Sequence, residues 1–122
     1  MSNNNAKKTT KEIGDAAELA AATYLKSQGY TILNTNYRYK KGEIDIIADK
    51  GGLLVFIEVK FRKNAAFGVP ESSVTSEKEN LIMETAEHYM IDTGHDGSIR
   101  FDIIAVDLIN GQYGIRHFED AF

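Results

Sequence analysis

The stretch GEIDIIADKGGLLVFIEVKFR, residues 42–62, most constrains what this chain can fold into. Two hydrophobic runs within it, 44–48 and 53–57, have the length and composition of buried strands. The four residues between them, DKGG at 49–52, tolerate the positive φ angles of tight turns. The stretch therefore predicts a β-hairpin that is buried in the core.

Three charged residues interrupt this apolar hairpin: Asp45 in its first strand, and Glu58 and Lys60 in its second. A turn that pairs Ala48 with Leu53 places Asp45 opposite Phe56. Because side chains alternate along a strand, all three charged residues then lie on one face of the sheet. Glu58 becomes the diagonal neighbour of Asp45, about 7–8 Å away at the backbone.

Buried charges are costly unless they are paired or bound to a metal, so this trio needs an explanation. Hard cations such as Mg²⁺ take oxygen ligands, usually one or two carboxylates with water and substrate phosphate. Lys60 could then orient the attacking water or neutralise charge that develops on a phosphate. The alternative is a structural salt-bridge network, Asp45–Lys60–Glu58, without chemistry. The spacing favours the functional interpretation.

The Asp and Glu-Val-Lys pattern resembles the restriction-endonuclease-like (PD-(D/E)XK) nuclease superfamily. From about residue 13 onward the chain also resembles the YraN-like family of bacterial proteins. The matching pieces are Gly14 with Glu18, GEIDIIA, VFIEVKFR, Phe67-Gly68, Lys78, Arg100-Phe101-Asp102 and Ala121-Phe122. The proline that often precedes the superfamily's aspartate is Ile44 here.

This resemblance implies a three-layer α/β sandwich: a mixed five-stranded sheet with helices on both faces, in the order α-β-β-β-α-β-β. It implies a Mg²⁺- or Mn²⁺-dependent endonuclease that acts on DNA, including branched or damaged DNA, for which a homodimer would be suitable. Asp45 and Glu58 would bind the metal with the carbonyl of Val59. Lys60 would be the catalytic lysine, and Glu18 an accessory carboxylate.

Three further cations are candidates for binding the substrate. Lys78 falls in the first turn of a helix expected at 76–91, where a positive charge is mildly unfavourable. Lys41 and Arg62 flank the hairpin, and 11 of the 14 Lys and Arg residues precede residue 64. The alternative for each cation is a solvated charge. The net charge of −4 and the acidic 76–91 helix favour a competing function, a catalytically silent nucleic-acid-binding or adaptor protein.

The rest of the chain predicts one domain at 9–122 after a disordered polar tail at 1–8. Helices are expected at 10–27, capped by Thr9, and at 76–91, capped by Ser76, and strands at 30–39, 99–109 and 112–118. Gly14 is expected to let the first helix approach the sheet closely, and a loop at 63–73 to lie near the site. Without cysteine, signal peptide or membrane helix, a cytoplasmic location and no membrane partner are expected.

Overall fold

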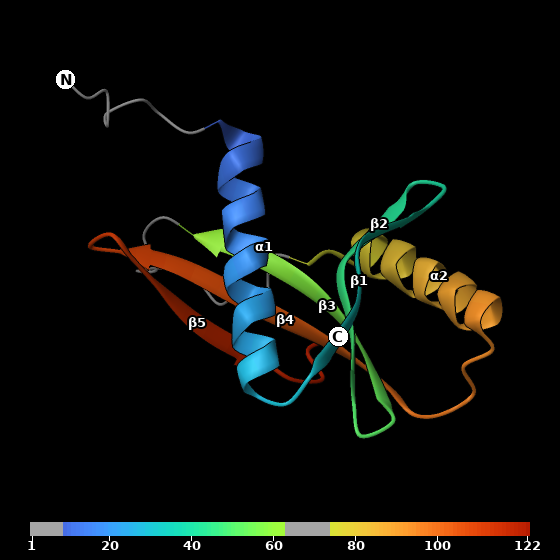
Figure 1. The fold of residues 1–122 in the computed structure, drawn as a ribbon. Helices are drawn as coiled ribbons and strands as arrows, with labels where there is room; N and C mark the ends of the chain where they lie inside the picture. The colour runs from blue at the N-terminus through green and yellow to red at the C-terminus, as the bar shows by residue number, and fades with distance from the viewer. Residues whose placement is uncertain (1–8, 63–73) are drawn as a thin grey trace.

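The chain folds into two helices and five strands in the computed structural model, which describes residues 9–62 and 74–122 (Figure 1). The elements are α1 (Thr10–Ser27), β1 (Thr31–Tyr39), β2 (Gly42–Lys50), β3 (Leu53–Arg62), α2 (Ser76–Thr93), β4 (Ile99–Ile109) and β5 (Gln112–Phe118). The predicted α/β class and element order are confirmed. The expectations for 1–8 and for the 63–73 loop lie outside the described residues.

The sheet is mixed, and its strands lie in the order β1-β2-β3-β4-β5. Neighbouring strands are antiparallel except β3 and β4, which are parallel. Parallel neighbours need a crossover connection, and α2 lies within it. The central strand β3 therefore joins a local meander, β1 to β3, to a pairing that spans a much longer part of the chain.

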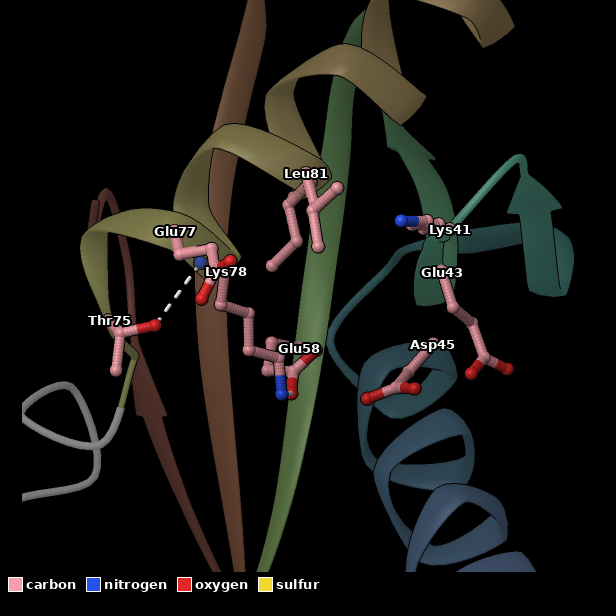
Figure 2. A pocket seen from close by; sticks show the side chains of 10 residues that line it. Lys41, Glu43, Asp45, Glu58, Thr75, Glu77, Lys78 and Leu81 are labelled. Carbon is pink, nitrogen blue, oxygen red and sulfur yellow. Dashed lines mark hydrogen bonds and ion pairs between the residues drawn. The ribbon is translucent and has the colours of Figure 1, made fainter.

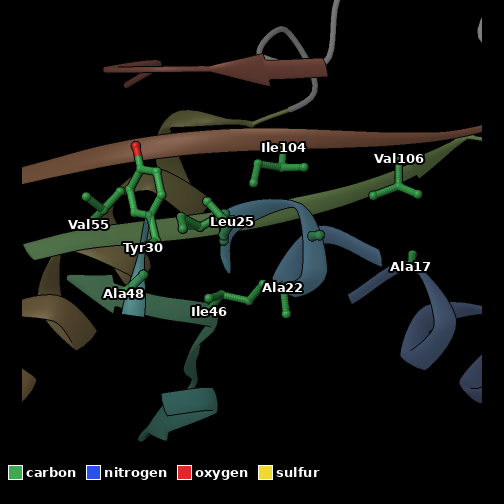
Figure 3. Packing of buried hydrophobic residues seen from close by; sticks show 11 residues of the cluster. Ala17, Ala22, Leu25, Tyr30, Ile46, Ala48, Val55, Ile104 and Val106 are labelled. Carbon is green, nitrogen blue, oxygen red and sulfur yellow. The ribbon is translucent and has the colours of Figure 1, made fainter. Parts of the chain in front are cut away.

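The two helices pack on opposite faces of this sheet. On β3, Val55 and Ile57 belong to the cluster under α1, whereas Leu54 and Phe56 belong to the cluster under α2. The α1 cluster is filled by small and aliphatic residues, several of which Figure 3 shows: Ala17, Ala22, Leu25, Ile46, Ala48, Ile104 and Val106. Small helix residues let α1 lie close to the strands, so β3 is buried on both faces.

Side-chain caps determine where both helices begin. Thr9 and Glu12 form the predicted capping box at the start of α1. The cap of α2 is Thr75, one residue before the predicted Ser76, and its hydroxyl accepts a hydrogen bond from the Lys78 amide at 3.1 Å. Threonine and serine cap similarly, so the pattern alone did not distinguish these adjacent positions.

The predicted pairing of β2 with β3 is wrong by two positions. Lys50, not Ala48, pairs with Leu53, and the turn consists of Gly51 and Gly52 with φ angles of 60° and 90°. Glycine adopts positive φ at little cost, so a turn of two glycines is preferred to one that needs a lysine in that conformation. An even shift preserves the face of each side chain and brings Asp45 level with Glu58 rather than diagonal to it.

The close helix–sheet approach predicted at Gly14 is at Gly42 instead. A Cβ atom added at Gly14 would have no heavy atom within 4 Å, apart from those of its two chain neighbours and of the nearby backbone of its own helix. At Gly42 it would lie 2.8 Å from the Leu81 carbonyl oxygen and would overlap the Thr85 hydroxyl. The start of β2 is therefore in direct contact with α2, next to the predicted site.

Neither helix in the described part of the chain combines the length and apolar character that crossing a membrane requires.

Candidate active site

A cavity of about 360 Å³ lies where the first turns of α2 meet β2 and β3 (Figure 2). Four of the predicted residues line it: Asp45 and Lys41 from the β2 side, Glu58 from β3 and Lys78 from α2. The other lining residues are Gly42, Glu43, Thr75, Glu77, Leu81 and Ile82. Sequence reasoning did not identify the α2 residues other than Lys78, because nothing in their pattern indicates which strands the helix covers.

Asp45 lies where β2 and β3 stop pairing. The β2–β3 ladder ends at Ile46 and Ile57, and the amide of Val59, two residues further along β3, donates to the Asp45 carboxylate at 2.8 Å. The aspartate side chain thus replaces a main-chain acceptor. Because the N–H and C=O groups of a strand residue point to the same edge, the Val59 carbonyl faces the same gap. This orientation suits the predicted ligand role of Val59, which stays a prediction.

Asp45 also carries the most unusual acidity at the site. Burial and the charge of Glu58 raise its pKa from 3.8 to about 7, against the opposing effect of the Val59 hydrogen bond. Within residues 9–62 and 74–122, Asp45 has no cationic side chain at ion-pair distance. A divalent cation would remove the repulsion between the two carboxylates.

Glu58 is buried, and two lysines share one of its oxygen atoms. The Nζ atom of Lys78 lies 2.5 Å from Glu58 Oε2, and that of Lys60 lies 3.5 Å from the same oxygen. Burial and the neighbouring charge of Lys78 lower the pKa of Lys60. Burial also lowers the pKa of Lys78, but Glu58 and then Asp45 outweigh it and raise that pKa above its usual value. The ion pairs therefore join Lys60, Glu58 and Lys78, and the alternative network with Asp45 as a member does not form.

Four predicted site residues lie outside the lining of this cavity: Glu18, Val59, Lys60 and Arg62. Glu18 projects from α1, on the opposite face of the sheet, and accepts a hydrogen bond from Asn36 at 3.0 Å. Burial raises the pKa of Glu18; the Asn36 hydrogen bond opposes this, and the charges of Glu43, Asp15 and Glu58 add to it. Glu18 is thus electrostatically linked to the cavity without lining it. Arg62 ends β3, paired in register with Asp107 of β4.

The described residues contain no group of three or more His, Cys, Asp or Glu side chains that could hold a metal ion between them. Asp45 and Glu58 supply two carboxylates, which is the usual protein share for Mg²⁺. The donor set fits such an ion when a main-chain carbonyl, water and substrate provide the remaining ligands. Displacement of Lys78 from Glu58 would accompany this fit, because both cations need the same carboxylate.

The buried charge of Asp102 lies outside this cavity and is held by structural contacts. Arg100 donates two hydrogen bonds to it, and the imidazole of His117 lies 2.7 Å from it. His88 is hydrogen bonded to Tyr37 at 2.7 Å. His88 and His117 are thus both held by hydrogen bonds to other side chains.

The fold and cavity together define an α/β protein with a mixed five-stranded sheet and a carboxylate–lysine cavity between that sheet and α2. The chain belongs to the family described as Uncharacterised protein family UPF0102, whose model matches residues 17–106. The predicted YraN-like family membership is thereby confirmed.

Three relatives illustrate the similarity, all described as UPF0102 proteins. The one from Alkaliphilus oremlandii is 44% identical, over 92% of this chain and 98% of the relative. Those from Flavobacterium psychrophilum and Geotalea daltonii are 42% and 43% identical, over 91% and 95% of this chain and 93% of each relative. Among solved structures, Pyrococcus furiosus SfsA in complex with Ca²⁺ matches with a TM-score of 0.36 and 11% identity, over 90% of this chain and 63% of that chain. That likeness is too low to carry an argument.

Proposed function

We propose that this chain is a restriction-endonuclease-like enzyme that hydrolyses DNA phosphodiester bonds with Mg²⁺ or Mn²⁺, including those of branched or damaged DNA. The observation that carries the proposal is the pair of carboxylates, Asp45 and Glu58, which share one cavity with Lys41 and Lys78. Lys60 pairs with Glu58 from outside the cavity lining. Asp45 forms no ion pair within the described residues, so the pair has an excess of negative charge on one side. A hard divalent cation with a phosphate ligand would complete it.

Each residue would have a distinct part in this reaction. Asp45 and Glu58, with the Val59 carbonyl, would hold the metal. When bound, the metal supplies Lewis-acid stabilisation of the negative charge on the phosphate oxygens. Lys60, next to Glu58, would orient the attacking water and take up its proton. Its lowered pKa supports a role as proton acceptor.

Three cations, Lys41, Lys78 and Arg62, would support substrate binding, and Glu18 would be an accessory carboxylate. Lys41 lines the cavity from the β1–β2 turn and would contact the phosphate backbone with Lys78. Glu18 would act from the other face of the sheet through its electrostatic link to Glu58. Arg62, beyond the cavity at the end of β3, would contact more distant phosphates.

A catalytically silent nucleic-acid-binding or adaptor protein remains the second candidate. One observation favours it: Glu58 already has two cationic partners, so its charge is neutralised without a metal. Glu43 and Glu77 add acidic charge to the cavity lining, which would oppose a phosphate backbone and so favours the adaptor over the nucleic-acid-binding form of this candidate. This candidate keeps the fold and the cavity but has no turnover.

A nuclease assay distinguishes the two functions. The purified chain would be incubated with linear, flapped and four-way DNA in Mg²⁺, in Mn²⁺ and in EDTA. We expect metal-dependent cleavage that Lys60→Ala and Asp45→Asn each reduce by about 10²-fold or more, since general-base and metal contributions have this size. Binding of these DNA substrates by the wild type without cleavage in either metal would favour the silent protein.

A further inference from the structure

Lys78 occupies the position on Glu58 that a metal ion would need. Its ammonium group lies 2.5 Å from Glu58 Oε2, which is ion-pair contact with one carboxylate oxygen. Figure 2 shows the lysine side chain running down from the first turn of α2 to Glu58, across the cavity from Asp45. A divalent cation that bound both carboxylates would meet this ammonium at Glu58.

Glu58 does not need Lys78 for charge neutralisation. Lys60 lies 3.5 Å from the same oxygen atom and emerges from the same strand, two residues along. If Lys78 left, Glu58 would keep one cationic partner. The Lys78 ammonium is therefore the one that a metal ion could replace.

Lys78 is also the partner that can leave without disturbing the fold. Its side chain is 40% exposed, against 24% for Lys60 and 7% for Glu58. It begins in the first turn of α2, where the helix dipole is unfavourable for a positive charge. Contact with Glu58 offsets this effect, and loss of the contact would favour movement of the ammonium towards solvent.

We infer that Lys78 is a built-in competitor of the metal: it fills the cation position on Glu58 in the metal-free protein, and metal binding displaces it into the cavity mouth. This inference rests on the proposed function, because it needs a metal at Asp45 and Glu58. It goes further by making Lys78 a regulator of metal affinity. By linkage, whatever weakens the Lys78–Glu58 contact strengthens metal binding, and the reverse.

Calorimetric titration with Mn²⁺ tests this inference with a matched pair of variants. Lys78→Met and Lys41→Met each remove one positive charge from the cavity lining and introduce no oxygen ligand. Of these two lysines in the described structure, Lys78 forms an ion pair with Glu58 and Lys41 does not. We expect Lys78→Met to bind Mn²⁺ about tenfold more tightly than wild type, a usual size for coupled sites, and Lys41→Met to differ by about twofold or less.

The outcomes separate the inference from the proposed function. Equal tightening in both variants, or none in Lys78→Met, would overturn the inference while wild-type binding that Asp45→Asn abolishes would still support the metal site. Absence of Mn²⁺ binding in the wild type and in Lys78→Met would overturn both.

A measurement on the unmodified protein provides a second test. Brief acetylation of surface amines with acetic anhydride, followed by mass spectrometry, reports how accessible each lysine is. We expect saturating Mn²⁺ to increase the acetylation rate of Lys78 several-fold and to leave that of the exposed Lys50 unchanged, because only Lys78 would lose a partner. A Lys78 rate that Mn²⁺ leaves unchanged or lowers would contradict the displacement.

Discussion

The ionised Asp45 carboxylate destabilises the folded protein, by an amount that depends on pH. Its folded-state pKa of about 7 exceeds the ordinary 3.8, so between these values the folded state binds the proton more tightly than the unfolded state. Stability therefore falls as pH rises through this window, and the full cost is present above pH 7. A bound metal would offset the same cost.

Replacing Asp45 with asparagine should consequently stabilise the metal-free protein at high pH only. Asparagine keeps an acceptor for the Val59 amide but has no charge. We expect a gain in the free energy of unfolding of about 1–2 kcal/mol near pH 8 in EDTA, and little gain near pH 4. Urea denaturation at both pH values measures it, with Asp96→Asn in the exposed α2–β4 loop as control. A gain of equal size at both pH values would contradict the assigned cause.

Part of the site could be predicted at the level of residues. The alternation of strand side chains was enough to place Asp45, Glu58 and Lys60 on one face. The cavity shared by Asp45 and Glu58 and the ion pair of Lys60 with Glu58 agree with this despite the error in register. The contact of Lys78 with Glu58 has no comparable rule, because it depends on where α2 lies over the sheet. Glu18 likewise lies on the opposite face, bonded to an asparagine in β1 that adopts a φ of 54°.

Among the elements, α2 is positioned by its contact with the first residue of β2. Any side chain at Gly42 would meet the buried Thr85 and the Leu81 carbonyl. Gly42→Ala should therefore destabilise the fold by about 1–3 kcal/mol through overpacking. It should also loosen the cavity, since Leu81 and Lys78 belong to the same helix.

Gly14→Ala is the matched control for that change. Gly14 lies inside α1, where an added Cβ has open space and φ is not positive. Alanine there should stabilise the protein by about 0.5–1 kcal/mol, because glycine loses more backbone freedom in a helix. Thermal and urea unfolding of both variants measures the difference. Similar effects of the two substitutions would show that the Gly42 contact does not constrain α2.

The order of elements follows from hydrophobic period and turn residues, and each predicted helix and strand is present. The register of β2 against β3 could not be predicted in the same way, because two consecutive glycines and a preceding lysine allow more than one turn. The observed turn is favoured over the predicted one because its positive φ angles fall on Gly51 and Gly52, and these angles are known only from the folded hairpin. The end of α2 at Thr93, two residues beyond the predicted one, reflects its left-handed cap at Gly94.

At the scale of the whole molecule, Asp102 connects elements that are distant in the chain. It lies fully buried in β4 and accepts hydrogen bonds from Arg100, in its own strand, and from the Asp120 amide beyond β5. His117 of β5 lies 2.7 Å from it and also contacts Tyr24 of α1 at 3.0 Å. The Asp102 carboxylate thus links β4 to β5 and to the segment after β5, and through His117 it is also connected to α1.

Asp102→Asn should destabilise the protein by about 3 kcal/mol near neutral pH, since the partly buried Arg100 would lose its buried counter-charge and keep the more exposed Glu119 at 3.6 Å. Burial tends to raise the pKa of Asp102, but the hydrogen bonds from His117, Arg100 and the Asp120 amide outweigh it and lower that pKa below 3.8. The stability it contributes is complete above about pH 4 and is lost as pH falls through the folded-state value. Urea denaturation at stepped acid pH should therefore show a smaller acid loss for the variant than for wild type; parallel curves would contradict this.

Because α2 lies in the crossover after β3, the residues of the cavity are synthesised in a fixed order. Asp45 and Glu58 are brought together by a hairpin of neighbouring strands, whereas Lys78 lies beyond it in the crossover to β4. A ribosome makes the chain from its amino end, so the acidic half of the cavity leaves the exit tunnel before its helix-borne lysine. Of the two lysines that pair with Glu58 in the described structure, Lys60 is the one already present during that interval.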